Sequence, residues 1–156
     1  AIDVTTSFYN IHFIFQKVFG DDMGFVAGKT IGVNPYGNSV IANGAYLKAK
    51  PDVVRNFVKV TQKAYAACAK NVEPCITALI DANSGLKRPS SMANWALVKE
   101  LMDADSSRNG AIGYFDPARM EADYKLIEAY FKVDKPFDIK GAYRNDFLDM
   151  SVKFGG

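Results

Sequence analysis

Apolar side chains recur at three- and four-residue spacing through the middle of the chain. From Val53 to Cys68 this spacing predicts an amphipathic helix with one apolar face. Pro51 suits its first turn, because the N–H that proline lacks would be unpaired there. Similar patterns predict three further helices over about residues 74–82, 90–103 and 117–131. Asp116 before Pro117 is a typical N-cap for the last of these helices.

Alternating polar and apolar residues indicate short strands nearer the N-terminus. The pattern predicts strands over residues 2–5, 25–33 and 39–43. Residues 5–7 carry three hydroxyls that can cap a helix beginning near Phe8. Helices therefore outnumber strands, and the sequence contains no internal repeat.

Length, charge and hydropathy limit the class of protein. A chain of 156 residues is long enough for one domain. The formal net charge of +2 arises from scattered side chains without a basic stripe, so nucleic-acid binding is not expected. No apolar run approaches the roughly 20 residues of a membrane-spanning helix.

Residues 34–63 combine a turn, a short strand, one helical turn and a long helix. Three segments here, residues 36–38, 39–43 and 50–58, together with the tail at 143–148, resemble substrate-binding proteins of bacterial ABC importers. The family includes receptors for taurine, alkanesulfonates, nitrate and thiamine-pyrimidine precursors. The resemblance implies an exported, periplasmic solute receptor that works with a membrane permease, without a cofactor and without catalysis.

The resemblance also implies a fold class and a division of the chain. We expect an α/β structure, mainly helical with short strands, forming the C-terminal part of a two-lobed type II periplasmic-binding-protein fold. Residues 1–30 would be a remnant of the second lobe plus the crossover, and residues 31–156 the return segment to the first lobe. The chain begins without a signal peptide, so we expect roughly the C-terminal half of a receptor. Such a half would associate with the N-terminal half or form a homodimer.

Two segments carry the candidate ligand-binding residues. The first lies where a predicted strand meets a helix, a usual ligand position in open α/β proteins, and the second is an amide- and aromatic-rich turn. The alternative is that the hydroxyls only cap a helix, the aromatic rings fill the core and the turn is a plain turn. The resemblance favours ligand contact, and the candidates are Thr5, Tyr9, Asn10, Asn34, Tyr36 and Asn38.

Other chemistry has little support in the sequence. One histidine and two cysteines cannot form a usual structural zinc site. Cys68 and Cys75 lie at consecutive helix ends, so they either form a disulfide or remain two buried thiols. A fungal synthase branch of the same fold makes the thiamine pyrimidine, but the cysteine-rich run of those enzymes is absent from residues 34–38. That enzyme and a helical protein-interaction module remain the alternative functions.

Overall fold

Helices form most of the regular structure of the chain. The computed structural model describes residues 3–156. Short helical turns connect or extend the α-helices at Tyr9–Ile11, Gly20–Asp22, Gly28–Ile31, Ser106–Gly110 and Ile139–Gly141. The α-helices are α1 (His12–Phe19), α2 (Gly44–Ala49), α3 (Pro51–Lys70), α4 (Glu73–Ala82), α5 (Arg88–Met102) and α6 (Pro117–Tyr130).

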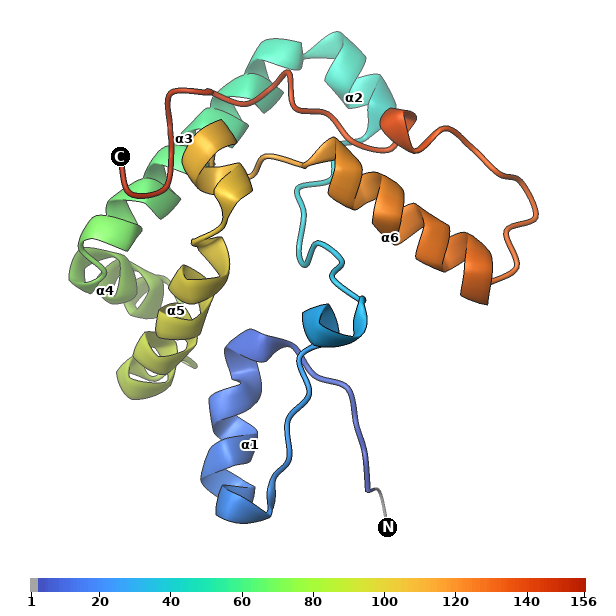
Figure 1. The fold of residues 1–156 in the computed structure, drawn as a ribbon. Coiled ribbons are helices and arrows are strands. Elements are labelled where there is room, and N and C mark those ends of the chain that lie inside the picture. The colour runs from blue at the N-terminus through green and yellow to red at the C-terminus, as the bar shows by residue number, and fades with distance from the viewer. Residues whose placement is uncertain (1–2) are drawn as a thin grey trace.

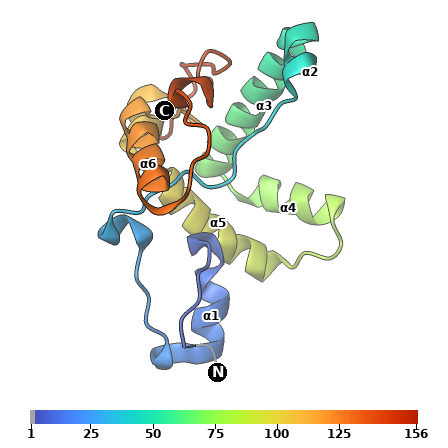
Figure 2. The same ribbon diagram turned by 90° about the vertical axis from the view of Figure 1, so that its right-hand side faces the viewer.

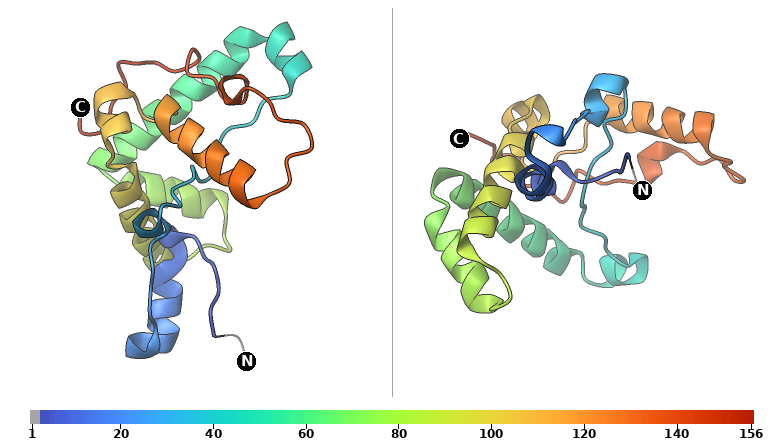
Figure 3. Two further views of the ribbon diagram at one scale, coloured as in Figure 1. Left: turned by 45° about the vertical axis from the view of Figure 1, so that its right-hand side comes forward. Right: turned by 90° about the horizontal axis from the view of Figure 1, so that it is seen from below.

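The helices do not stack in regular layers (Figure 1). α3 is the longest helix, and α4 and α5 fold back from its C-terminal end, while α6 lies on the opposite side (Figure 1). α1 lies below α5 and projects away from the other helices (Figures 2 and 3). An extended segment then leads from α1 to α2, and it contains Asn34, Tyr36 and Asn38.

The four long helices begin within two residues of the predicted starts, and the cap predicted at Asp116 is confirmed. Pro51 opens α3, and the side chain of Asp116 accepts hydrogen bonds from the first backbone N–H groups of α6. Residues 5–7 do not cap a helix, however, because the first helical turn begins after Phe8 without any side-chain cap. The cap predicted at Asp116, before Pro117, is therefore correct, and the cap predicted at residues 5–7 is wrong.

The predicted α/β type II periplasmic-binding fold is wrong, because residues 3–156 contain no β-strand and no sheet. Residues 39–43 are extended but unpaired, and Ile41 is 93% exposed. Part of the predicted strand at 25–33 forms the turn Gly28–Ile31 instead. Of the strand predicted at 2–5, Ile2 lies outside the described residues and residues 3–5 are irregular. A strand requires a hydrogen-bonded neighbour, and the described residues of these segments have none.

The best-packed region lies where the C-terminal segment crosses α3. Gln62 is only 3% exposed, and its side-chain nitrogen donates to the carbonyl oxygen of Ile112 at 2.8 Å. Its side-chain oxygen accepts from the backbone N–H of Asp149 at 2.9 Å. One and two turns earlier on α3, Lys59 pairs with Asp149 at 3.1 Å, and Arg55 donates to the carbonyl oxygen of Asp146 at 2.6 Å. A polar stripe of α3 therefore holds the C-terminal segment in place.

The apolar face predicted for α3 is only partly covered. Val53 is 50% exposed and Phe57 is 58% exposed. The total accessible surface is 11417 Å², whereas a compact monomer of this mass exposes roughly 7,700 Å². Much of the apolar surface that the sequence pattern assigns to a core consequently faces solvent.

Candidate functional site

Arg119 of α6 fixes the segment that contains Asn34 and Tyr36. Its Nε donates to the backbone carbonyl oxygen of Asn34 at 2.7 Å. One terminal nitrogen reaches the side-chain oxygen of Asn34 at 3.2 Å and the carbonyl oxygen of Pro35 at 3.0 Å. The guanidinium carbon lies 3.9 Å from the centre of the Tyr36 ring, which is cation–π geometry. One planar cation thus orders a turn that is 85 residues away in sequence.

Tyr36 also contacts the segment that leads into α6. Its hydroxyl oxygen accepts a hydrogen bond from the backbone N–H of Asp116 at 2.8 Å. Phe115 meets the ring edge-on with the centroids 5.0 Å apart, and Tyr143 lies 5.7 Å from Phe115. These contacts define a Tyr36 cluster of one amide-rich turn, three aromatic rings and a guanidinium. Such a cluster can stack on a flat ring or donate hydrogen bonds to an acceptor.

Asp123 lies one helical turn beyond Arg119 and is half-buried. Burial raises the pKa of its carboxyl group, and the positive charge of Arg119 partly opposes that rise. The guanidinium therefore has an acidic neighbour on α6 in addition to its contacts with the turn.

Tyr9 and Asn10 bind to α5 instead. The Tyr9 hydroxyl donates to both carboxylate oxygens of Glu100, at 3.1 and 3.2 Å. This bond, together with burial and the negative charge of Glu100, raises the pKa of Tyr9. Asn94 donates to the backbone carbonyl oxygen of Asn10 at 3.0 Å. The Tyr9 ring stacks near His12 with the centroids 6.1 Å apart.

The six predicted residues thus separate into two groups and two single positions. Asn34 and Tyr36 share the Tyr36 cluster, whereas Tyr9 and Asn10 pack against α5, and no hydrogen bond or ring contact among residues 3–156 joins the two groups. Thr5 and Asn38 are exposed. Asn34 and Tyr36 therefore share one contact set with Arg119, whereas Tyr9 and Asn10 are held by α5.

Sequence reasoning missed Arg119 and Glu100. Their partners lie 85 and 91 residues away, so helical periodicity gave no sign of the contacts. Phe115 and Tyr143 also lie in the Tyr36 cluster, although neither was among the predicted site residues. The N-cap at Asp116 was the one available signal, because it fixes the start of α6 and hence the position of Arg119.

Cys68 and Cys75 form a disulfide, which confirms one of the two predicted alternatives. The sulfur atoms are 2.00 Å apart and the Cα atoms 5.8 Å apart. The bridge joins the end of α3 to the start of α4. Within residues 3–156 no group of three or more histidine, cysteine, aspartate or glutamate side chains is placed to hold a metal ion, and no helix is long and apolar enough to cross a membrane.

Comparison with known proteins gives one family match. The family model described as NMT1/THI5 like matches residues 1–74. The match supports a link to the substrate-binding family and covers all six predicted site residues, but it ends in the first turn of α4 and does not reach α5 or α6. No curated protein and no solved structure matches the chain.

Proposed function

We propose that the chain is a solute-binding component of an ABC importer and that it binds a small polar or aromatic molecule at the Tyr36 cluster. One observation carries the proposal, namely the NMT1/THI5-like match over residues 1–74, which includes the Asn34–Tyr36 turn. The geometry adds support, because Arg119 already holds this turn in one conformation. A preorganised site loses less conformational entropy on binding than a mobile one.

The proposed receptor is not an enzyme and is exported to the periplasm, where a membrane permease would be its partner. The Cys68–Cys75 disulfide supports export, since such bridges persist in oxidising compartments. Sulfonates and thiamine-pyrimidine precursors belong to the solute classes that we propose. Both offer acceptor atoms for N–H donors, and the pyrimidines add a flat ring for stacking on Tyr36.

Isothermal titration calorimetry against pyrimidines, alkanesulfonates and aromatic acids tests the proposal. We expect saturable binding of at least one class, weakened about tenfold in Tyr36→Ala. Tyr130→Ala is the matched control, because Tyr130 is 80% exposed at the end of α6. Equal affinity in both variants would remove Tyr36 from the site, and turnover of a bound compound would favour the synthase-like enzyme.

A helical protein-interaction module is the second candidate. The observation that favours it is the accessible surface of 11417 Å², which exceeds that of a compact monomer by roughly 3,700 Å². Stable permanent interfaces bury areas of roughly this size. This candidate predicts concentration-dependent association in light scattering and no heat with any compound of the solute panel.

A further inference from the structure

A groove with unpaired positive charge runs between α3 and α5. It consists of one cavity of about 490 Å³ and a second of about 230 Å³. The two cavities share Ala69 and Lys70 of α3 with Ala96 and Lys99 of α5, so they are continuous. Because the side chains of Ala69 and Ala96 are small, they leave space between the two helices. None of the six predicted ligand-binding residues lines either cavity, which makes the groove separate from the Tyr36 cluster.

Most charged groups around the larger cavity already have partners. Arg108 binds both carboxylate oxygens of Asp103, one of them at 2.7 Å, and this bond lowers the pKa of Asp103. Glu100 accepts the hydrogen bond from Tyr9, and Lys153 donates to a backbone carbonyl oxygen at 3.0 Å.

Lys70 and Lys99 are the remaining charged side chains of the lining. Neither makes an ion pair with any side chain of residues 3–156. The groove therefore has surplus positive charge at the point where its two cavities meet. Both lysines are exposed, and either can form an ion pair with a bound anion.

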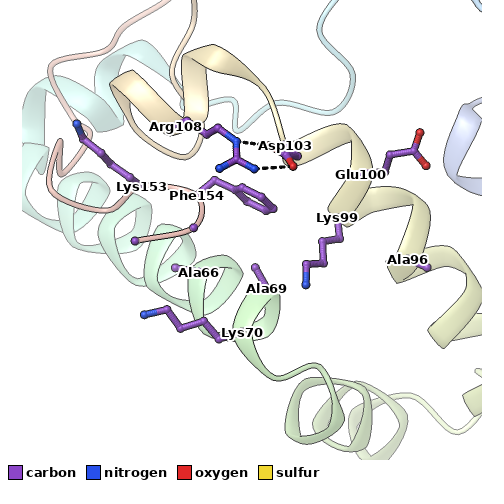
Figure 4. A pocket seen from close by; sticks show the side chains of 12 residues that line it. Ala66, Ala69, Lys70, Ala96, Lys99, Glu100, Asp103, Arg108, Lys153 and Phe154 are labelled. Carbon is purple, nitrogen blue, oxygen red and sulfur yellow. Dashed lines mark hydrogen bonds and ion pairs between the residues drawn. The ribbon is translucent and has the colours of Figure 1, made fainter.

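Each of the two cavities that Lys99 lines also has an aromatic side chain in its wall. Lys99 extends from α5 across the groove toward α3, and Glu100 turns away from it (Figure 4). The Phe154 ring faces the larger cavity, and the guanidinium carbon of Arg108 lies 5.5 Å from the ring centre. Trp95 lines the smaller cavity and stacks on Tyr65 with the centroids 6.0 Å apart.

We propose that this groove binds a small organic anion with an aromatic body. The acidic group of the ligand pairs with Lys99, and its ring lies against Trp95. An ammonium group and an aromatic side chain that line the same groove recognise such a molecule through charge and stacking together. The cavity of about 490 Å³ is large enough for a ligand of this class. The proposal does not depend on the solute-receptor function, because it uses neither Tyr36 nor Arg119.

Fluorescence of Trp95 is a direct probe, because it is the single tryptophan of the chain. The unaltered chain is titrated with phenylacetate, with its neutral analogue phenylacetamide, and with acetate, which has no ring. We expect a saturable change with phenylacetate and binding at least about tenfold weaker with the other two compounds. No saturable response to phenylacetate, or an equal response to phenylacetamide, would overturn the proposal.

Substitution of Lys99 tests the assigned residue. Lys99→Gln is expected to weaken phenylacetate binding about tenfold, whereas Lys99→Arg retains it because the charge remains. Lys63→Gln is the matched control, since Lys63 is an exposed lysine of α3 outside the groove. Native affinity in Lys99→Gln would refute the assignment. Circular dichroism of each variant distinguishes loss of the helices from loss of the site, and the phenylacetamide comparison tests the unaltered chain if a variant fails to fold.

Discussion

Arg119→Lys should release the Asn34–Tyr36 turn from α6. We expect a lysine ammonium, which lacks the planar fork of arginine, to replace one of the three hydrogen bonds that Arg119 makes to Asn34 and Pro35. Losing two partly exposed bonds removes about 1.5 kcal/mol. The poorer cation–π contact with Tyr36 removes roughly 0.5 kcal/mol more. The turn is thus destabilised by about 2 kcal/mol, which is a factor of roughly 30 in a local opening equilibrium.

The backbone N–H of Asp116 reports this opening, because its hydrogen-bond acceptor is the Tyr36 hydroxyl. Amide hydrogen exchange measured by NMR should be faster by a factor of roughly 30 at Asp116 in the variant. Arg88→Lys is the control, since Arg88 makes comparable side-chain contacts with Glu73 and Thr77 at a distant site. An unchanged rate at Asp116 in Arg119→Lys, or an equal increase in Arg88→Lys, would refute the reasoning.

Three further predictions concern stability. Gln62→Leu leaves buried backbone groups without partners and should reduce the free energy of unfolding in urea by roughly 2–4 kcal/mol. Hydrogen bonds from the Ser151 hydroxyl and N–H, together with the hydrogen bond and charge of Lys59, lower the pKa of Asp149 to about 2. The folded state therefore favours the Asp149 carboxylate, and the stability gained from it is present above about pH 4 and is lost as the pH falls toward 2. Ser151→Ala should make the urea midpoint less dependent on pH between these values. Reducing the Cys68–Cys75 bridge, which spans 7 positions, should cost about 2 kcal/mol in the same assay.

The Gln62 prediction has a matched control, and each of the three stability predictions has an outcome that would contradict it. Gln16→Leu alters the other glutamine, which is exposed and bonds only to the carbonyl oxygen of Gly20, so it should change stability little. Equal losses in the two glutamine variants would mean that the hydrogen bonds from Gln62 to the C-terminal segment do not stabilise the fold. A pH dependence unaltered by Ser151→Ala, or unfolding unaffected by reduction, would contradict the other two arguments.

The sequence predicted the helices well because their signals are local. Pro51 and Asp116 mark helix starts through chemistry that acts within one turn, and α3 and α6 begin where these residues require. The strands failed for the opposite reason. Residues 39–43 have strand-like composition, but a strand also needs a neighbour, and alternation of residue types cannot show whether the chain supplies one.

The candidate site was only partly accessible to sequence reasoning. The aromatic and amide residues of the turn were visible as a group, but their anchor at Arg119 depends on how α6 packs against the turn. Likewise, Tyr9 was predicted beside a ligand, and in the structure its hydroxyl binds Glu100. Long-range pairs of this kind follow from tertiary packing, which a single sequence does not encode in any local pattern.

The most direct test of the solute-receptor account is an NMR titration that observes the Nε–H of Arg119 while a calorimetrically active solute is added. This group points at the Asn34 carbonyl oxygen, beside the Tyr36 ring. The account predicts that its resonance and the backbone amides of residues 34, 36 and 37 shift together and saturate at the calorimetric dissociation constant. Shifts confined to other residues, or none at any solute concentration that gives heat, would contradict binding at the Tyr36 cluster.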